Sequence, residues 1–193
     1  MKQERKERPS VADLEAELKR VRYKSRYQAV LRSTVYTLIT VAAVAVLVAT
    51  LWLPVLQIYG SSMTPTLQDG EIVFSVKTND MKPGDVVAFY YNNKILIKRV
   101  IANAGDWVDI AEDGTVYIND AELIEPYLEE KSFGDADIEL PYQVPDGKFF
   151  VMGDHRATSS DSRHTAVGCI SPDQVVGKIV FRVWPLDQFG TVG

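Results

Sequence analysis

Residues 71–101 read EIVFSVKTNDMKPGDVVAFYYNNKILIKRVI, and the pattern of this stretch decides the fold. It holds three runs rich in β-branched and aromatic residues, at 71–76, 85–91 and 94–101. Turn signals separate them, first Pro83-Gly84 and then Asn92-Asn93. Runs of this length and composition between turn residues predict short β-strands.

The same pattern continues towards the C-terminus. Further β-rich runs read TVYI, KFFVMG and KIVFRVW, and further turn signals include Asp113-Gly114 and Pro145-Asp146-Gly147. No long helical pattern follows Gln57, so the sequence predicts a mainly β domain at 57–193, an antiparallel sandwich or a partly open barrel. Within it, residues 119–146 are acidic and loop-like, which indicates an insertion or a small subdomain.

A different pattern precedes the strands. No charged residue occurs from Ser33 to Gln68, and residues 34–56 read TVYTLITVAAVAVLVATLWLPVL. About 20 apolar residues span a bilayer as a helix, whereas a cleaved signal peptide has an apolar core of about 7–15. The sequence therefore predicts a retained transmembrane helix at 33–56, in contact with membrane lipid.

Charge is divided unevenly along the chain. The whole protein has 21 Lys and Arg against 26 Asp and Glu, yet residues 1–32 carry ten basic and five acidic side chains. The positive-inside rule then predicts that 1–32 is a cytoplasmic basic segment, with a short helix at 10–31 capped by Ser10, and that 57–193 lies on the outer face. The acidic remainder has no basic stripe, which argues against nucleic-acid binding.

Two segments offer candidate catalytic groups. Residues 59–67 read YGSSMTPTL, and Ser62 lies six residues beyond Leu56, hence within roughly 20 Å of the end of the predicted span. Lys98 lies in the strand 94–101, where apolar neighbours would desolvate it and lower its pKa, as a general base requires. Taken alone, the residues around Ser62 are better interpreted as a hydroxyl-rich linker, and Lys98 as a strand lysine whose amine reaches water.

A third segment is dense in hydrogen-bonding groups. Residues 153–163 read GDHRATSSDSR, directly after an apolar run. Asp161 and Arg163 are spaced to pair locally in an extended chain, and Ser159 or Ser160 could hydrogen-bond to a lysine amine. The segment is either a solvated loop or the support of a catalytic site.

These segments, in this order after an N-terminal span, resemble bacterial type I signal peptidases of the serine–lysine kind. The matching pieces are GSSMTPTL at 60–67, PGDVVAF at 83–89, IKRV at 97–100, GDHRATSSDSR at 153–163 and FRVWPL at 181–186. The resemblance covers nearly all of 57–189. It implies a largely β fold and a serine endopeptidase that cleaves leader peptides from secreted preproteins on the outer face of the cell membrane, without metal or cofactor. The substrate signal peptides would be its partners, with the translocation machinery nearby.

The resemblance also implies roles for individual residues. Ser62 would be the nucleophile, Lys98 the general base and Ser159 the residue that orients the lysine. Four further positions would shape or brace the site, namely Gly153, Asp154, Asp161 and Arg163. Candidate residues lining shallow pockets for small substrate side chains are Ile58, Met63, Leu67, Leu96 and Ile97. Some members have a serine at Gly60 whose hydroxyl binds the oxyanion; glycine cannot, so the Ser62 N–H remains as one donor and the second stays open.

Two other classes of function remain as alternatives. A sortase-like cysteine transpeptidase would use Cys169, the only cysteine, with His155 and Arg163. Its cysteine lies in TAVGCIS, unlike that family's TLxTC, and His155 is expected to be a loop residue. A non-enzymatic, membrane-anchored scaffold domain would need neither Ser62 nor Lys98, and both are present.

Overall fold

The computed structural model describes residues 11–52, 54–78 and 80–192, which include eleven β-strands and one long helix. The chain divides into two compact units, Met1–Ala49 and Thr50–Gly193. The predicted cap Ser10 and the first part of the basic segment lie outside the described residues.

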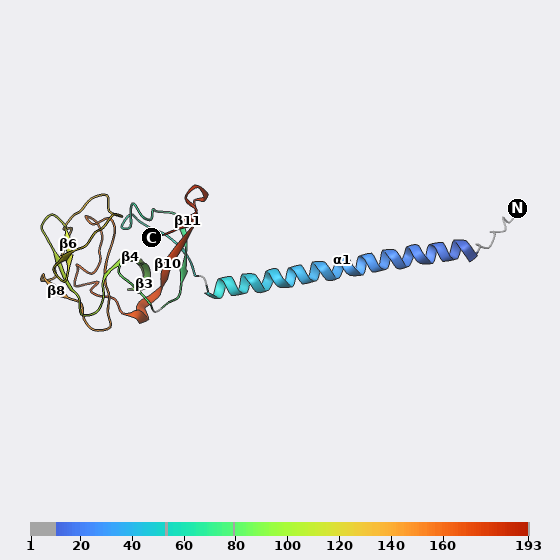
Figure 1. The fold of residues 1–193 in the computed structure, drawn as a ribbon, viewed down its shortest axis with the longest axis horizontal. Helices are drawn as coiled ribbons and strands as arrows, with labels where there is room; N and C mark the ends of the chain where they lie inside the picture. The colour runs from blue at the N-terminus through green and yellow to red at the C-terminus, as the bar shows by residue number, and fades with distance from the viewer. Residues whose placement is uncertain (1–10, 53, 79, 193) are drawn as a thin grey trace. The chain divides into compact units, whose positions relative to one another are not determined.

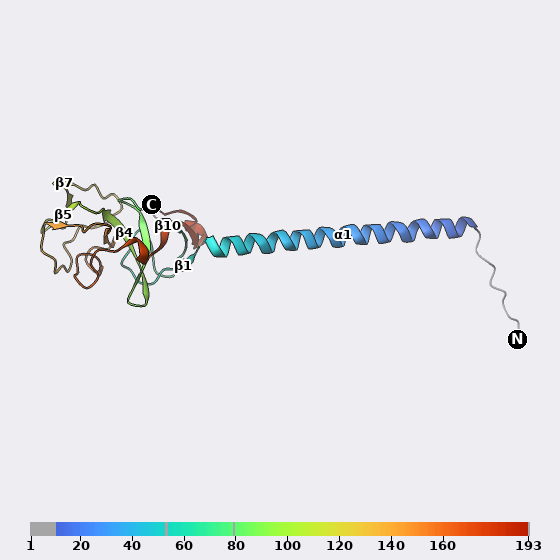
Figure 2. The ribbon, with the colours of Figure 1, turned by 90° about the horizontal axis from the view of Figure 1, so that it is seen from below.

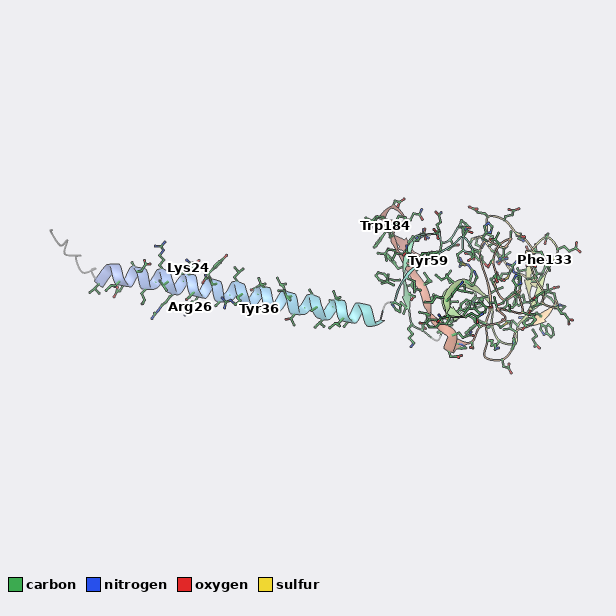
Figure 3. All side chains as sticks on the ribbon, turned by 180° about the vertical axis from the view of Figure 1, so that it is seen from behind. Lys24, Arg26, Tyr36, Tyr59, Phe133 and Trp184 are labelled. Carbon is green, nitrogen blue, oxygen red and sulfur yellow. The ribbon has the colours of Figure 1, made fainter. Side chains whose placement is uncertain are left out.

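The N-terminal unit is formed by helix α1 (Val11–Trp52), which runs without interruption (Figure 1). The sequence predicted two separate helices here, and they are one. Lys24, Arg26 and Tyr36 project from its surface (Figure 3). Residues Leu14–Val48 contain an 18-residue window of mean hydropathy 1.9, so by length and composition this helix could cross a membrane.

The helix ends earlier than the apolar run from which it was predicted. Pro54, which has no N–H to continue a helical hydrogen-bond pattern, lies between the last helical residue, Trp52, and the strand that follows. Val55 and Leu56, assigned to the span by their hydrophobicity, instead form strand β1 (Val55–Gln57) and pair with Phe74 and Val73.

Most strands of the C-terminal unit belong to one antiparallel sheet. Its order is β1-β2-β10-β3-β4-β9, with β11 paired to β10. The path is open, since within the described part of the chain β1 and β9 at its two ends pair only with β2 and β4 respectively. The sequence prediction of a mainly β, antiparallel and partly open domain is therefore confirmed. The remaining bounds in this sheet are β2 (Ile72–Val76), β3 (Val86–Tyr91), β4 (Lys94–Ala102), β9 (Phe150–Met152), β10 (Val175–Trp184) and β11 (Gly190–Thr191).

A second, smaller sheet has the order β7-β6-β5-β8. Its strands lie together at one end of the unit in both ribbon views (Figures 1 and 2). The acidic residues 119–146 contribute two of its strands and are otherwise irregular, so this segment is built into the second sheet. The bounds are β5 (Trp107–Ile110), β6 (Val116–Ile118), β7 (Ala121–Glu122) and β8 (Tyr142–Gln143); the two 3₁₀ turns are η1 (Pro172–Gln174) and η2 (Leu186–Gln188).

The β3–β4 hairpin lies at the centre of the main sheet and is covered on both faces. Its turn residues Asn92 and Asn93 have φ of 44° and 62°, the left-handed geometry of a tight hairpin turn. Along β3, Val86 and Ala88 pack into one apolar cluster, while Val87 and Phe89 pack into another. Because both faces are covered, polar residues carried by the inner half of β4 are withdrawn from water.

Candidate active site

Ser62 lies in the loop that connects the paired strands β1 and β2 of the main sheet. Backbone hydrogen bonds join Ile58 and Glu71, and Met63 and Leu67 anchor the loop in the core with 2% and 0% exposure. Gly60 has φ of +85°, and its N–H donates to Asp69 Oδ1 at 2.6 Å. The left-handed turn that only glycine adopts readily therefore fixes the chain immediately before the candidate nucleophile.

Lys98 reaches Ser62 from strand β4. Its backbone is paired with Val87 of β3, and the residue is only 2% exposed. Nζ of Lys98 lies 2.7 Å from Oγ of Ser62, within hydrogen-bond distance. Two residues from separate sequence segments, both selected from the sequence, are thus in direct contact.

The surroundings of Lys98 lower its pKa to about 8 from an ordinary value of 10.5. Burial is the main cause, because an ammonium loses its hydration there. The nearby charge of Arg163 acts in the same direction, whereas the carboxylates of Asp161 and Asp154 partly oppose it. A substantial neutral fraction of the amine at neutral pH is what a general base requires.

The segment 153–163 closes over this pair at Gly153. A Cβ at that position would lie 2.2 Å from Ser159 Oγ and 2.5 Å from the Ser62 carbonyl oxygen, so only glycine permits the approach. The next residue but one, His155, donates its N–H to the same Ser62 oxygen at 3.1 Å. Ser159 is 4% exposed, and its side chain interacts with the Asp161 carboxylate. It lies in the site without holding the Lys98 amine in this structure.

Asp161 and Arg163 form the local pair expected from their spacing. Arg163 Nε and Nη2 donate to the two carboxylate oxygens of Asp161, each at 2.9 Å. Asp161 Oδ2 also accepts the Gly153 N–H at 3.0 Å. Burial would raise the pKa of Asp161, but the hydrogen bonds and charge of Arg163 outweigh it and hold that pKa below its usual range. The pair fixes the position of Gly153.

Asp154 is held by Arg99, the residue after Lys98. Arg99 donates to both carboxylate oxygens of Asp154, at 3.0 and 2.7 Å, and to the Gly84 carbonyl at 2.7 Å. Asp154 also accepts the Thr66 hydroxyl at 2.5 Å. One buried carboxylate therefore connects strand β4, the segment 153–163 and the loop that carries Ser62.

An apolar cavity of about 520 Å³ adjoins the Ser62–Lys98 pair. It is lined by strand β1, the loop after it and the first half of β4. Four of the five residues predicted to line substrate pockets border it, namely Ile58, Met63, Leu96 and Ile97. Leu67, the fifth, is fully buried in the core and does not border this cavity.

The residues of the cysteine alternative do not come together. Cys169 contacts the Tyr142 hydroxyl at 4.0 Å, and burial raises the pKa of its thiol. The His155 ring bonds to Thr158, and Arg163 is engaged by Asp161. No hydrogen bond joins Cys169, His155 and Arg163 among the residues that the structure describes. In the same residues, no cluster of three His, Cys, Asp or Glu side chains could hold a metal ion.

Sequence inspection missed the buried residues that support the site from outside the recognised segments. Tyr127 lies against the Arg99 guanidinium, 3.9 Å from the ring centroid to Cζ. Glu125 forms a fully buried ion pair with Arg156. The one available signal was the adjacent cations Lys98 and Arg99 on a strand. At least one of them had to face the interior, and both are buried.

Comparison with known proteins gives a consistent set of relatives. The family described as signal peptidase, peptidase S26, matches residues 31–184. Signal peptidase IB of Staphylococcus aureus (strain Mu50) is 41% identical over 153 residues, with coverage of 68% of this chain and 78% of that protein. Signal peptidase I of Streptococcus pneumoniae serotype 4 is 33% identical over 174 residues, with coverage of 70% and 84%. A crystal structure of a signal peptidase I from Enterococcus faecalis V583 has 29% identity and a TM-score of 0.44, and covers 51% of this chain and 96% of that one.

Proposed function

The chain belongs to the peptidase S26 family of signal peptidases, and we propose that it is a membrane-anchored serine endopeptidase whose Ser62–Lys98 dyad removes leader peptides. The observation that carries this proposal is the 2.7 Å contact between Ser62 Oγ and a buried Lys98 Nζ whose pKa is lowered. A nucleophile and its base must be within hydrogen-bond reach, and the base must be able to exist unprotonated.

The reaction follows from this pair. The neutral Lys98 amine takes the hydroxyl proton of Ser62 as Oγ attacks the carbonyl carbon of the scissile peptide bond. The tetrahedral intermediate then breaks its C–N bond, and the Lys98 ammonium gives its proton to the leaving amine. An ester on Ser62 remains. Water attacks this ester while Lys98 accepts a proton, and the Ser62 hydroxyl is regenerated as the leader peptide departs.

Developing charge on the carbonyl oxygen needs a hydrogen-bond donor. The Ser62 N–H donates to no residue in the described part of the chain, so it is free for this role. The Gly60 N–H is already engaged by Asp69 at 2.6 Å and is not available as a second donor.

Two unpaired strand edges suit an extended substrate. Among the described residues, strand β1 pairs only with β2, and β4 pairs with β9 only from Arg99 onward. Both β1 and residues 94–98 of β4 border the apolar cavity beside Ser62. A leader peptide that adds as a strand would satisfy these edges and place alternate side chains in the cavity. Small residues at the −1 and −3 positions suit walls built from Ile58, Met63, Leu96 and Ile97.

The anchoring and orientation complete the proposal. Helix α1 has the apolar length to span a bilayer, and basic residues such as Lys24 and Arg26 lie on its N-terminal half. The positive-inside rule puts that end in the cytoplasm and the β unit on the outer face, where preproteins emerge.

The proposal is tested with the full chain in detergent and a leader-peptide substrate that carries alanine at −1 and −3. Wild-type protein and the control Ser61→Ala should release the leader by a single cut after −1, which mass spectrometry identifies. Ser62→Ala and Lys98→Ala should lose activity by at least about 10³-fold. Cleavage by either variant at more than a tenth of the wild-type rate would contradict the dyad.

A further inference from the structure

The acidic segment 119–146 contacts the candidate site through two residues outside the recognised motifs, the buried Glu125 and the half-buried Tyr127. The first contact joins Glu125 to Arg156, whose side chains are both fully buried and share two hydrogen bonds. The second places the Tyr127 ring against the Arg99 guanidinium at 3.9 Å. The Tyr127 hydroxyl donates to Glu125 Oε1 at 2.7 Å, so the two contacts form one unit.

Each of these contacts involves an arginine that lies next to a residue of the site: Arg99 follows Lys98, and Arg156 follows the residue that holds the Ser62 carbonyl. Arg99 follows Lys98 directly on β4, and its side chain donates hydrogen bonds to Asp154, Gly84 and Thr66. Arg156 follows His155, whose N–H holds the Ser62 carbonyl at 3.1 Å, and its own Nε donates to the Gly153 carbonyl at 3.1 Å. Glu125 and Tyr127 therefore support the backbone on both sides of the 2.7 Å contact.

We propose that Glu125 and Tyr127 are positioning residues for the Ser62–Lys98 pair, and that fixing this pair is a function of the acidic segment. The inference rests on the proposed function. The physical reason is that a displacement of about 1 Å between nucleophile and base reduces the rate by about a hundredfold. Both residues act through Arg99 and Arg156, and neither reaches the substrate.

The charge of Glu125 distinguishes a positioning role from a merely structural one, because removing that charge should change the pH dependence of cleavage. The charged groups that act on Lys98 are Asp154, Asp161 and Arg163, all from the segment 153–163. The Lys98 amine is also in contact with the neutral Ser62 hydroxyl. Glu125 neutralises Arg156, which interacts with Asp154 in turn. Glu125→Gln leaves a buried guanidinium unpaired, and added positive charge disfavours the Lys98 ammonium.

The first test measures kcat/KM for leader cleavage against pH with the full chain in detergent. In the pH profile of Glu125→Gln, the acidic limb, on which kcat/KM rises as Lys98 loses its proton, should move to lower pH by about half a unit. The reason is that Lys98 loses its proton more readily in this variant. Glu125→Gln/Arg156→Gln removes both charges and should return the limb to the wild-type position. Glu139→Gln makes the same change at an exposed position of the same segment and should leave the limb unmoved.

The second test uses Tyr127, which is only partly buried and tolerates substitution more readily than Glu125. Tyr127→Leu removes the ring from Arg99, and kcat should fall about tenfold or more with KM changed less than about twofold. Tyr127→Phe keeps the ring and should retain most of kcat. Tyr117→Leu, at a half-buried tyrosine of β6, is the matched control and should behave as wild type.

Two outcomes would overturn the inference. One is that Glu125→Gln and Tyr127→Leu both fold and keep the wild-type kcat and the wild-type position of the acidic limb of the pH profile. The other is a loss of activity that merely follows the fraction of folded protein, with the limb unmoved. If Glu125→Gln does not fold, the Tyr127 variants decide. Ser62→Ala and Lys98→Ala in the same assay separate this failure from that of the proposed function, since they stay inactive whenever the dyad is correct.

Discussion

Replacing the candidate base should make the protein inactive and, below pH 8, more stable. Lys98 is 2% exposed and its pKa is lowered to about 8, chiefly by burial. Lys98→Met keeps a flexible side chain of similar length but removes the amine. At pH 7 the wild-type fold must either bury an ammonium or hold the lysine unprotonated, and the variant is freed from both costs.

The lowered pKa sets the size of the gain. One pKa unit corresponds to about 1.4 kcal/mol, so lowering the pKa from 10.5 to about 8 costs the folded wild-type protein about 3 kcal/mol. The unfolded lysine keeps its proton up to about pH 10.5, whereas the folded one loses it near pH 8. Between these values the unfolded state binds more protons, so wild-type stability rises with pH. The penalty is complete below pH 8 and absent above pH 10.5.

The measurement is urea unfolding of the full chain in detergent at pH 7 and pH 10.5, followed by tryptophan fluorescence. Lys98→Met should exceed wild type in the free energy of unfolding by about 3 kcal/mol at pH 7, and the difference should shrink towards zero at pH 10.5. Lys94→Met, exposed on the same strand, is the control and should show no such pH-dependent difference. A variant less stable than wild type at pH 7, or an equal difference at both pH values, would refute the reasoning.

Three further outcomes are expected. The kcat/KM of leader cleavage should rise as the pH increases through about 8, because about a tenth of Lys98 is neutral at pH 7. If replacing a histidine abolished this rise, the assignment of Lys98 as the base would be contradicted. Gly153→Ala should lower kcat at least about a hundredfold, since its Cβ would displace the Ser62 carbonyl. The control is Gly190→Ala, where an added Cβ has no atom within 4 Å; this variant should cleave normally and have an unchanged circular dichroism spectrum. Iodoacetamide treatment of Cys169 should leave the rate within about twofold of the untreated protein, because this half-buried thiol with a raised pKa lies outside the proposed mechanism.

The longer strands could be predicted from sequence because their signal is local. The runs at 71–76, 85–91 and 94–101 correspond to β2, β3 and β4 within one residue at either end. Strands β1, β7 and β8 have two or three residues, too few for any periodicity, and exist through their pairing with longer neighbours. Hydrophobicity alone also misplaced the helix end, because Val55 and Leu56 suit a strand as well as a membrane span.

The same distinction applies to the candidate site. Asp161 and Arg163 are two residues apart, so an extended chain brings them together and the pair was predictable. Arg99 and Asp154 are separated by 55 residues, and Glu125 and Arg156 by 31. Nothing local in a sequence indicates which carboxylate a distant arginine meets, so these contacts required the fold.

Lys98 and Arg99 are adjacent and both buried, but the fold gives their side chains different partners. The fold supplies the Arg99 guanidinium with the Asp154 carboxylate, the Gly84 carbonyl and the Tyr127 ring. The Lys98 amine is hydrogen-bonded only to the Ser62 hydroxyl among the described residues. Without a directly bonded carboxylate, the Lys98 amine has a pKa that burial lowers. The neighbouring arginine, fully paired, holds the strand and the segment 153–163 in the positions at which that deprotonated amine meets the serine.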